Sequence, residues 1–473
     1  MSNVLHFGAK GDGTTDDTKA IEHALTQGDG VLEFPRGDYL VTGTIVVPLA
    51  RTGRVAIRGD GGTAKVIMAG PGPVFHLVGT HGGSAHPPDF KPEIWAGQRM
   101  PTVTQLEIEG RHPEADGFRV EGVMQATFES VLLRELRNAI HIVKRNRNVL
   151  ISHCHIYHCT GVGVYLDGVN LHQTNIASSH ISYCRRGGIR IEKSEIRNLQ
   201  ITGNDIEYNN VNTFKGMENE PTAEIWIDAS ADGASVREGT IASNTIQATY
   251  SPGGANIRMI GRAGEDAAGH LNRRAGMWTI TGNLIGSQET NVHLVNCRGV
   301  VVSGNFIYSG HRRNVLVEGG KNIVMNGNCF EHNPDYKEKE LCTGVRVVDS
   351  ENVTFAGSIL HDCQAGKHTV PTEAQFARDG LLELVRCKRV TISGSQILDG
   401  VPHCLYVENS DHVNLSGCTF MDTREPKLTQ SPVKFAGKGT GNYINGCTIG
   451  KGVNDALIAE KDAGVTVGQN LVA

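Results

Sequence analysis

A short phrase ending in Gly-Asn recurs along this chain at a nearly constant interval. It occupies residues 198–204, 299–305 and 322–328. In the central copies the asparagine falls at positions 283, 305 and 328, so the steps are 22 and 23 residues. That interval is the length of chain in one turn of a wound β-solenoid. The repeat therefore predicts a stack of coils.

A second pattern runs in step with the phrase, because each repeat contains a short strand in which every other residue is apolar. Side chains alternate across a strand, so the apolar members are expected to point into the solenoid and the residues between them to point outward. The expected inward pairs include 140/142, 164/166, 189/191, 225/227, 257/259 and 292/294. These strands are expected to stack into one sheet.

The interval stretches in the middle of the chain. It is 36 residues from Ile189 to Ile225, 32 from Ile225 to Ile257 and 35 from Ile257 to Val292. The extra residues must leave the coil as loops, notably 208–222 and 261–276. Three long-looped coils in succession are predicted to wall off a groove.

The composition is consistent with one long body. A chain of 473 residues would suggest about three domains, but a repeat protein stacks its modules. Its 58 glycines and 5% aromatic residues suit frequent turns around a thin core of small β-branched side chains. We predict a single β-solenoid domain over residues 1–473, with a cap and first strands at 1–50, a long loop at 70–101 and regular coils at 116–470.

Charge and hydropathy exclude several classes of partner. The net charge is −5 and the basic residues are spread along the chain, so no nucleic-acid partner is expected. No apolar run approaches the ~20 residues that span a bilayer, so no membrane partner is expected either. The first residues lack a basic segment followed by an apolar one. This leaves a cytoplasmic location and a trimmed secreted form both open.

The cysteines predict neither a metal site nor a disulfide framework. There are 11, an odd number, and none stands in a Cys-x-x-Cys pair. Cys154, Cys418 and Cys447 occupy the repeat position of the asparagines and are expected to point inward as reduced thiols. The segments 331–335 and 361–363 combine His with acidic residues, but turn formation explains them. No metal and no cofactor is expected.

The N-terminal segment carries a longer motif. It reads Phe-Gly-Ala-Lys-Gly-Asp-Gly-Thr-Thr-Asp-Asp at 7–17, then Ala-Ile at 20–21 and Phe-Pro-Arg-Gly-Asp-Tyr at 34–39. This opening resembles that of the pectate-lyase-3 or rhamnogalacturonase/epimerase-like superfamily. The resemblance implies an all-β, right-handed parallel β-helix with a short N-terminal capping helix, in a group dominated by carbohydrate-active enzymes. Phage tailspikes and polygalacturonase-like hydrolases share the opening, so it indicates fold better than reaction.

Outward positions of the one sheet supply the candidate site. They carry titratable groups, guanidinium groups that can form paired hydrogen bonds, and an aromatic ring on which a sugar can stack, a composition that suits a sugar site. The predicted catalytic carboxylates are Glu192, Glu224, Asp228 and, in a turn before one strand, Glu207. The predicted substrate-binding residues are Trp226, Arg190, Arg258, His293, Tyr165 and His141. We predict a poly- or oligosaccharide substrate in a groove across the coils of residues 139–293.

Aligning the apolar pairs 189/191 and 225/227 sets Glu192 beside Asp228 and Arg190 beside Trp226. Strands lie ~4.8 Å apart, which matches the ~5 Å between the carboxylates of a retaining glycosidase. Glu224 and Asp228 lie roughly 13 Å apart along one strand, nearer the inverting separation. Polygalacturonase-like enzymes carry an Asp-Asp pair before such a strand. The turns here have none, so that catalytic assignment is not transferred.

The sequence leaves three functions open and favours glycoside hydrolysis. Outward arginines at 119, 190, 258 and 346 also suit an anionic substrate. A polysaccharide lyase or epimerase acting on a uronate would then use His293, Tyr165 or Lys193 as its base. The third is a non-catalytic glycan-binding or tailspike-like module. The plain coils at the C-terminus show no cap, which indicates homo-oligomer contacts at that end.

Overall fold

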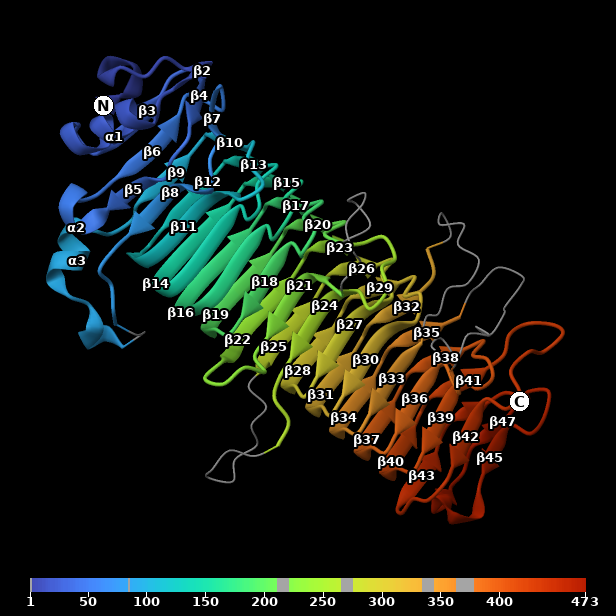
Figure 1. Cartoon of the computed structure of the whole chain (residues 1–473). Coiled ribbons are helices and arrows are strands. Elements are labelled where there is room, and N and C mark those ends of the chain that lie inside the picture. The colour runs from blue at the N-terminus through green and yellow to red at the C-terminus, as the bar shows by residue number, and fades with distance from the viewer. Residues whose placement is uncertain (1, 84–85, 211–220, 265–274, 334–343, 363–377) are drawn as a thin grey trace. The chain divides into compact units, whose positions relative to one another are not determined.

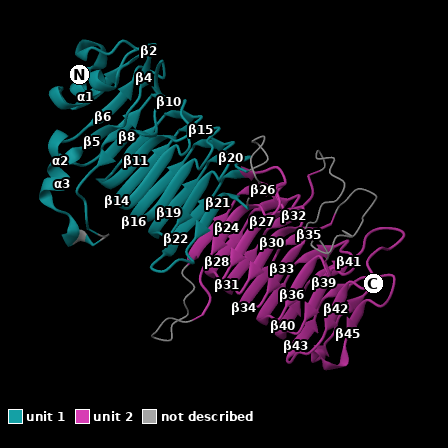
Figure 2. Cartoon of the chain, in the orientation of Figure 1, with its two compact units in different colours: residues 1–245 teal, residues 246–473 magenta. Residues whose placement is uncertain are grey.

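The computed structural model describes residues 2–83, 86–210, 221–264, 275–333, 344–362 and 378–473. The chain forms two compact units, Met1–Thr245 and Ile246–Ala473 (Figure 2). Each unit is built from parallel strands wound into coils, and the fold is the predicted right-handed β-helix (Figure 1). Much of the two predicted loops, residues 211–220 and 265–274, lies outside the described residues.

A coil of the first unit contributes two strands to one sheet and a third strand to another. The coil of β18 (Ile189–Glu192), β19 (Glu195–Thr202) and β20 (Asp205–Glu207) is an example. The other strands of its first sheet are β1 (Ser2–Asn3), β3 (Val31–Phe34), β5 (Ile45–Pro48), β6 (Ala56–Gly59), β8 (Gly72–Val78), β9 (Thr102–Thr104), β11 (Ala115–Met124), β12 (Thr127–Glu129), β14 (Ile140–Ser152), β16 (Val164–Ala177), β21 (Ala223–Asp228) and β22 (Ser235–Ala242). Its second sheet adds β2 (Asp12–Asp16), β4 (Gly37–Val41), β7 (Ala64–Met68), β10 (Glu107–Gly110), β13 (Leu132–Arg134), β15 (His155–Tyr157) and β17 (His180–Ser182).

Short helices accompany these strands in the first unit. They are η1 (Val4–Phe7), α1 (Thr18–Gln27), α2 (Leu49–Thr52), η2 (Pro87–Asp89) and α3 (Pro92–Gly97). The capping helix α1 buries Ile21, Ala24 and Leu25 at helical spacing at the N-terminal end of this unit (Figure 1). In segment 70–101, where the sequence predicts a long loop, Gly72–Val78 instead form β8, because Phe75 and Leu77 point into the core.

The second unit repeats the same coil. Its first sheet holds β24 (Ala255–Ile260), β25 (Ala275–Thr281), β27 (Thr290–Val295), β28 (Arg298–Ser303), β30 (Arg313–Glu318), β31 (Lys321–Asn326), β33 (Val345–Val348), β34 (Glu351–Ala356), β36 (Leu382–Val385), β37 (Lys388–Ser393), β39 (Leu405–Glu408), β40 (Asp411–Ser416), β42 (Val433–Ala436), β43 (Asn442–Asn445), β45 (Leu457–Ala459) and β46 (Val465–Val467). Its second sheet holds β26 (Leu284–Gly286), β29 (Phe306–Tyr308), β32 (Cys329–Glu331), β35 (Ile359–His361), β38 (Gln396–Leu398), β41 (Thr419–Met421), β44 (Thr448–Ile449) and β47 (Leu471–Val472), and η5 (Lys461–Ala463) follows β45.

The Gly-Asn phrase forms the turn between two sheets. Gly304 has a φ of +62°, a left-handed conformation that glycine adopts without strain. The next residue, Asn305, points inward, and its side-chain carbonyl accepts hydrogen bonds from both the backbone and the side chain of Asn283. Asn305 in turn donates to Asn328 at 3.0 Å. A ladder of buried amides therefore satisfies the backbone groups that the turn leaves unpaired.

Cys154, Cys418 and Cys447 are buried free thiols at the asparagine position, as predicted. Apolar strand residues such as Ile189, Ile191, Ile225 and Ile227 are fully buried in the core. Within the described part of the chain, no helix is both long and apolar enough to cross a membrane.

Candidate active site

Outward residues of four neighbouring strands line up on the first unit. His141 on β14 pairs with Tyr165 on β16, Tyr165 pairs with Arg190 on β18, and Arg190 pairs with Trp226 on β21. Two residues further along the same strands, Glu192 pairs with Asp228. The predicted alignment of Glu192 with Asp228 and of Arg190 with Trp226 is confirmed.

Glu192 is held by two of its neighbours. The Tyr165 hydroxyl donates a hydrogen bond to Glu192 Oε2 at 2.8 Å, and Arg190 Nη2 donates to Oε1 at 2.7 Å. The Arg190 guanidinium also lies over the Trp226 ring, 4.7 Å from its centroid. Burial acts to raise the pKa of Glu192, but the hydrogen bond and charge of Arg190 outweigh it and leave the pKa lowered. Glu192 is therefore an oriented, ionised carboxylate at neutral pH.

Tyr165 and His141 stay uncharged beside this carboxylate. Burial, and then the bond to Glu192, raise the pKa of Tyr165, so its hydroxyl keeps its proton. The His141 ring stacks on Tyr165 with centroids 5.0 Å apart and planes 8° from parallel. Burial lowers the pKa of His141, which makes it a neutral imidazole at pH 7 and leaves it able to accept a proton.

Asp167 was missed by the sequence reasoning. It pairs with Glu192 from the opposite side to Asp228, so three carboxylates stand on one outward row of β16, β18 and β21. Its Oδ2 lies 3.3 Å from His141 Nε2. Continuing the apolar alternation of β16 one residue beyond Leu166 would have identified Asp167 as an outward residue.

An arginine-lined cleft of about 280 Å³ opens beside Tyr165 and Glu192. We call it the arginine cleft, after its four arginines: Arg137, Arg185, Arg186 and Arg190. Arg137 Nε donates to the buried Asp116 at 2.9 Å, which fixes its position. Three of the arginines lie in turns, where strand alternation gives no signal. The sequence did show that these arginines come shortly before β14 and β18, and this was the one sign that they could lie near the outward residues of those strands.

Glu224 does not point outward, so that expectation is wrong. It is fully buried, and its carboxylate accepts hydrogen bonds from Asn209 N at 2.9 Å and Asn209 Nδ2 at 2.6 Å. Burial is the main cause of a pKa raised well above the usual value. Glu224 is the second residue of β21, where the chain is still leaving a turn, so strict alternation fails there. The preceding coil has Gly188 at this position, packed against Asn209.

Asp228 and Glu207 differ in their surroundings. Asp228 Oδ1 accepts hydrogen bonds from Ser230 N at 2.8 Å and Ser230 Oγ at 2.6 Å. Glu207 lies on β20, in the second sheet, and pairs with Ser182. Burial, and then the neighbouring Asp205 carboxylate, raise the pKa of Glu207 to about 7. Glu207 is not among the residues that line the arginine cleft.

The raised pKa of Glu207 predicts a pH dependence of stability. Between its ordinary pKa of 4.5 and about 7, the folded chain keeps a proton that the unfolded chain releases. The free energy of unfolding therefore falls as pH rises through that window. We expect Glu207→Gln to flatten this fall, measured by thermal unfolding across the window. Identical pH profiles for the variant and the natural chain would contradict the assignment.

Arg258 and His293 belong to the second unit and contact one another. Arg258 Nε donates to His293 Nδ1 at 3.2 Å, and His293 Nε2 lies 2.7 Å from Glu318 Oε2. Burial lowers the pKa of Arg258 to about 10. This cluster includes Glu318, which the sequence reasoning did not select.

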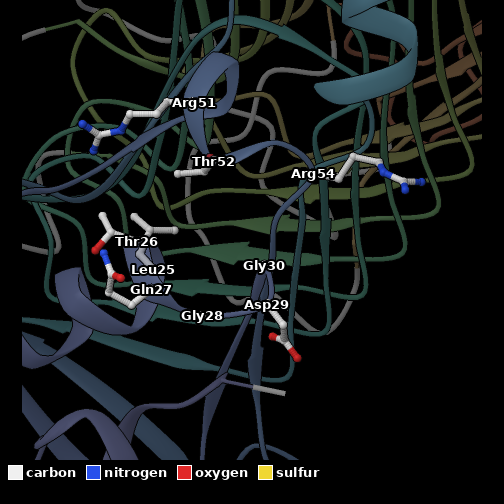
Figure 3. Close-up of a pocket in the computed structure, with 9 residues that line it drawn as sticks. All are labelled: Leu25, Thr26, Gln27, Gly28, Asp29, Gly30, Arg51, Thr52 and Arg54. Carbon is white, nitrogen blue, oxygen red and sulfur yellow. The ribbon is translucent and has the colours of Figure 1, made fainter.

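A pocket of about 580 Å³ lies at the N-terminal cap, lined by the end of α1, by residues 28–30 and by the end of α2 with Arg54 beyond it (Figure 3). Its lining includes Asp29, Arg51 and Arg54 but none of the predicted site residues. Among the residues that the structure describes, no group of three or more His, Cys, Asp or Glu side chains is arranged to hold a metal ion.

Two family models match the chain. The model described as "Right handed beta helix region" matches residues 94–258 and 224–374, which together make up more than half of the chain. The chain belongs to the right-handed β-helix family. The model described as "Rhamnogalacturonase A/epimerase, pectate lyase-like" matches residues 1–86, so the resemblance of the N-terminal opening is confirmed.

Individual relatives are more distant or match short segments. A "Probable glucan endo-1,3-beta-glucosidase" of Arthroderma benhamiae is 56% identical over 48 residues, which are 10% of this chain and only 6% of that protein. Among solved structures, the A-module of mannuronan C-5 epimerase AlgE6 from Azotobacter vinelandii is 15% identical with a TM-score of 0.41, over 100% of this chain and 99% of that one. The catalytic unit of a GH87 alpha-1,3-glucanase from Streptomyces thermodiastaticus is 14% identical with a TM-score of 0.39, over 100% of this chain and 68% of that one.

Proposed function

We propose that this β-helix protein is a carbohydrate-active enzyme that binds an acidic poly- or oligosaccharide in the arginine cleft. The observation that carries the proposal is the lining of the cleft, with four arginines and a single glutamate. Guanidinium groups match carboxylate and sulfate bidentately, so such a lining favours an anionic sugar. The Trp226 ring, ordered under Arg190, supplies an apolar plate for a neighbouring sugar ring.

Hydrolysis of a glycosidic bond is the reaction that we favour. Glu192 is ionised and oriented by Tyr165 and Arg190, as a carboxylate nucleophile or base must be. Asp228 stands on the next strand, ~4.8 Å away, which is near the carboxylate spacing of retaining enzymes. In this mechanism Glu192 attacks the anomeric carbon as the glycosidic C–O bond breaks, and Asp228 gives a proton to the leaving oxygen. Water, deprotonated by Asp228, then cleaves the ester between Glu192 and the sugar.

Elimination or epimerisation at a uronate is the second candidate, and the arginines favour it as well. A guanidinium bound to the uronate carboxylate stabilises the charge that develops when the C5 proton leaves. His141, neutral and stacked on Tyr165, can accept that proton. Elimination then breaks the bond between C4 and the glycosidic oxygen, whereas epimerisation returns a proton to the other face of C5.

A substrate screen tests the proposed function. We expect new reducing ends from an acidic polymer such as polygalacturonate or alginate, and few from a neutral glucan. Ultraviolet absorbance of an unsaturated product would favour the lyase over the hydrolase. A change in the uronate epimer ratio without cleavage would favour the epimerase. Turnover restricted to neutral glucans would contradict the acidic substrate class.

The double substitution Arg185→Ala with Arg186→Ala is expected to raise KM for the acidic substrate about tenfold or more. Each side chain supplies a charge-assisted hydrogen bond, and losing one costs roughly a factor of ten in affinity. The expected effect on kcat is smaller, since in this proposal the two arginines bind the substrate and take no part in the bond-breaking step. The matched control is Arg386→Ala with Arg389→Ala, two exposed arginines of the second unit. Equal KM values in the two double variants would contradict the role of the cleft.

A further inference from the structure

A second groove, of about 680 Å³, lies on the first unit and shares no lining residue with the arginine cleft. None of its nine lining residues carries a charge, and six of them are amides. The lining consists of Met100, Gln125, Thr127, Asn148, Leu150, Gln173, Asn175, Asn198 and Gln200. We call this surface the amide groove. It crosses β12, β14, β16 and β19.

The lining residues form two parallel rows that repeat once per coil. In the first row Thr127, Leu150, Asn175 and Gln200 are neighbours in strand register. The second row lies two residues earlier in each coil and holds Gln125, Asn148, Gln173 and Asn198, with φ of 62°, 55°, 61° and 56°. Because adjacent strands are ~4.8 Å apart, the amides recur at that step, and four coils span about 14 Å.

The amides of the groove are not committed to partners in the protein. Within the described part of the chain, no hydrogen bond joins any of the six amide side chains to another residue. Asn148 Oδ1 is even buried without a partner. At the corresponding turns of the second unit, by contrast, Asn352 Nδ2 donates to Asn322 at 2.7 Å and Arg389 Nε donates to Asn352 at 2.6 Å. The amide groove therefore presents a regular array of amide donors and acceptors that make no hydrogen bond with the described residues of the protein.

The chemistry of this array selects its ligand. An amide offers both a donor and an acceptor, as does a sugar hydroxyl, whereas an anion or cation would need an opposite charge that the lining lacks. Leu150 and Met100, 44% and 59% exposed, add apolar contacts for the C–H faces of sugar rings. The lining has none of the aromatic or arginine anchors that protein partners favour. We propose that the amide groove binds an uncharged oligosaccharide laid along the coils, independently of the arginine cleft.

Titration calorimetry with three neutral probes, cellohexaose, laminarihexaose and maltohexaose, tests this proposal. We expect saturable binding of at least one probe to the natural chain. Replacing Asn175 and Gln200 together by alanine should weaken that binding about tenfold or more, because two or more hydrogen bonds are lost. Both side chains are exposed, so thermal unfolding should stay unchanged.

The matched control is Asn414→Ala, an exposed asparagine at an outward position of β40 in the second unit, which should leave binding unchanged. Binding of an oligogalacturonate to the arginine cleft should survive the double substitution, which separates this proposal from the proposed function. A second variant, Leu150→Asp, should also abolish binding by placing a charge in the middle of the groove. The proposal is overturned if none of the three probes binds the natural chain, or if the double variant binds as tightly as the control.

Discussion

Replacing Glu192 by glutamine is expected to lower kcat on the acidic glycan by at least about 10²- to 10⁴-fold, the range for loss of an acid–base group, which loss of a nucleophile equals or exceeds. Glutamine keeps an acceptor for the Tyr165 hydroxyl and nearly the same volume, but it carries no charge and cannot attack a sugar carbon or accept a proton. Thermal unfolding should change little, because Glu192 is a partly exposed surface group. Turnover is measured from reducing ends under saturating substrate.

The chain offers a closely matched control for this substitution in Glu33→Gln. Glu33 also points outward from a strand of the first unit, and Arg58 Nη2 lies 3.1 Å from its Oε1. The side chains of Glu33 and Glu192 are 21% and 20% exposed. Equal activity of the two variants would remove Glu192 from the catalytic machinery. This result would favour the second candidate, elimination or epimerisation with His141 as the proton acceptor.

The fold was predictable because two independent periodicities agreed. The 22- to 23-residue step gave the coil, and the apolar alternation gave the inward face of each strand. Together they also gave the register, since matching Ile189 and Ile191 to Ile225 and Ile227 aligned Glu192 with Asp228. Burial of the apolar pair fixes register strongly, because a slip by one residue would expose every core side chain.

The same reasoning failed at the ends of strands. Alternation with the inward Ile225 predicts an outward Glu224. The chain is still leaving a turn at this residue, however, and the carboxylate points towards Asn209 inside the coil. Arg137, Arg185 and Arg186 lie in turns, whose side-chain directions depend on local backbone angles that no periodicity encodes. The sequence therefore predicted only three residues of the arginine cleft, Tyr165, Arg190 and Glu192, and not the cleft itself.

Among the substitutions considered, removing one asparagine from the buried amide ladder of the Gly-Asn phrase is expected to lower the free energy of unfolding most. Asn305→Ala should lower the free energy of unfolding by about 3 kcal/mol, the cost of leaving two or more buried polar groups unsatisfied. Asn305 accepts two hydrogen bonds from Asn283 and donates to Ile280 O and Asn328 Oδ1, each at 3.0 Å. Alanine removes all four in a site that water does not reach. Chemical denaturation followed by circular dichroism measures the change.

Asn305→Ser is the informative comparison, because the chain itself uses serine at this position in other coils. Ser358 Oγ accepts from Asn328 N at 3.2 Å and donates to Ala356 O at 3.2 Å, so a hydroxyl keeps part of the ladder. We therefore expect Asn305→Ser to lower the free energy of unfolding by less than Asn305→Ala does. The surface substitution Asn414→Ala should change the free energy of unfolding by less than about 0.5 kcal/mol. If alanine and serine cost the same, the asparagine matters for its volume and not for its hydrogen bonds. The repeated asparagine would then stabilise the fold through packing and not through hydrogen bonds.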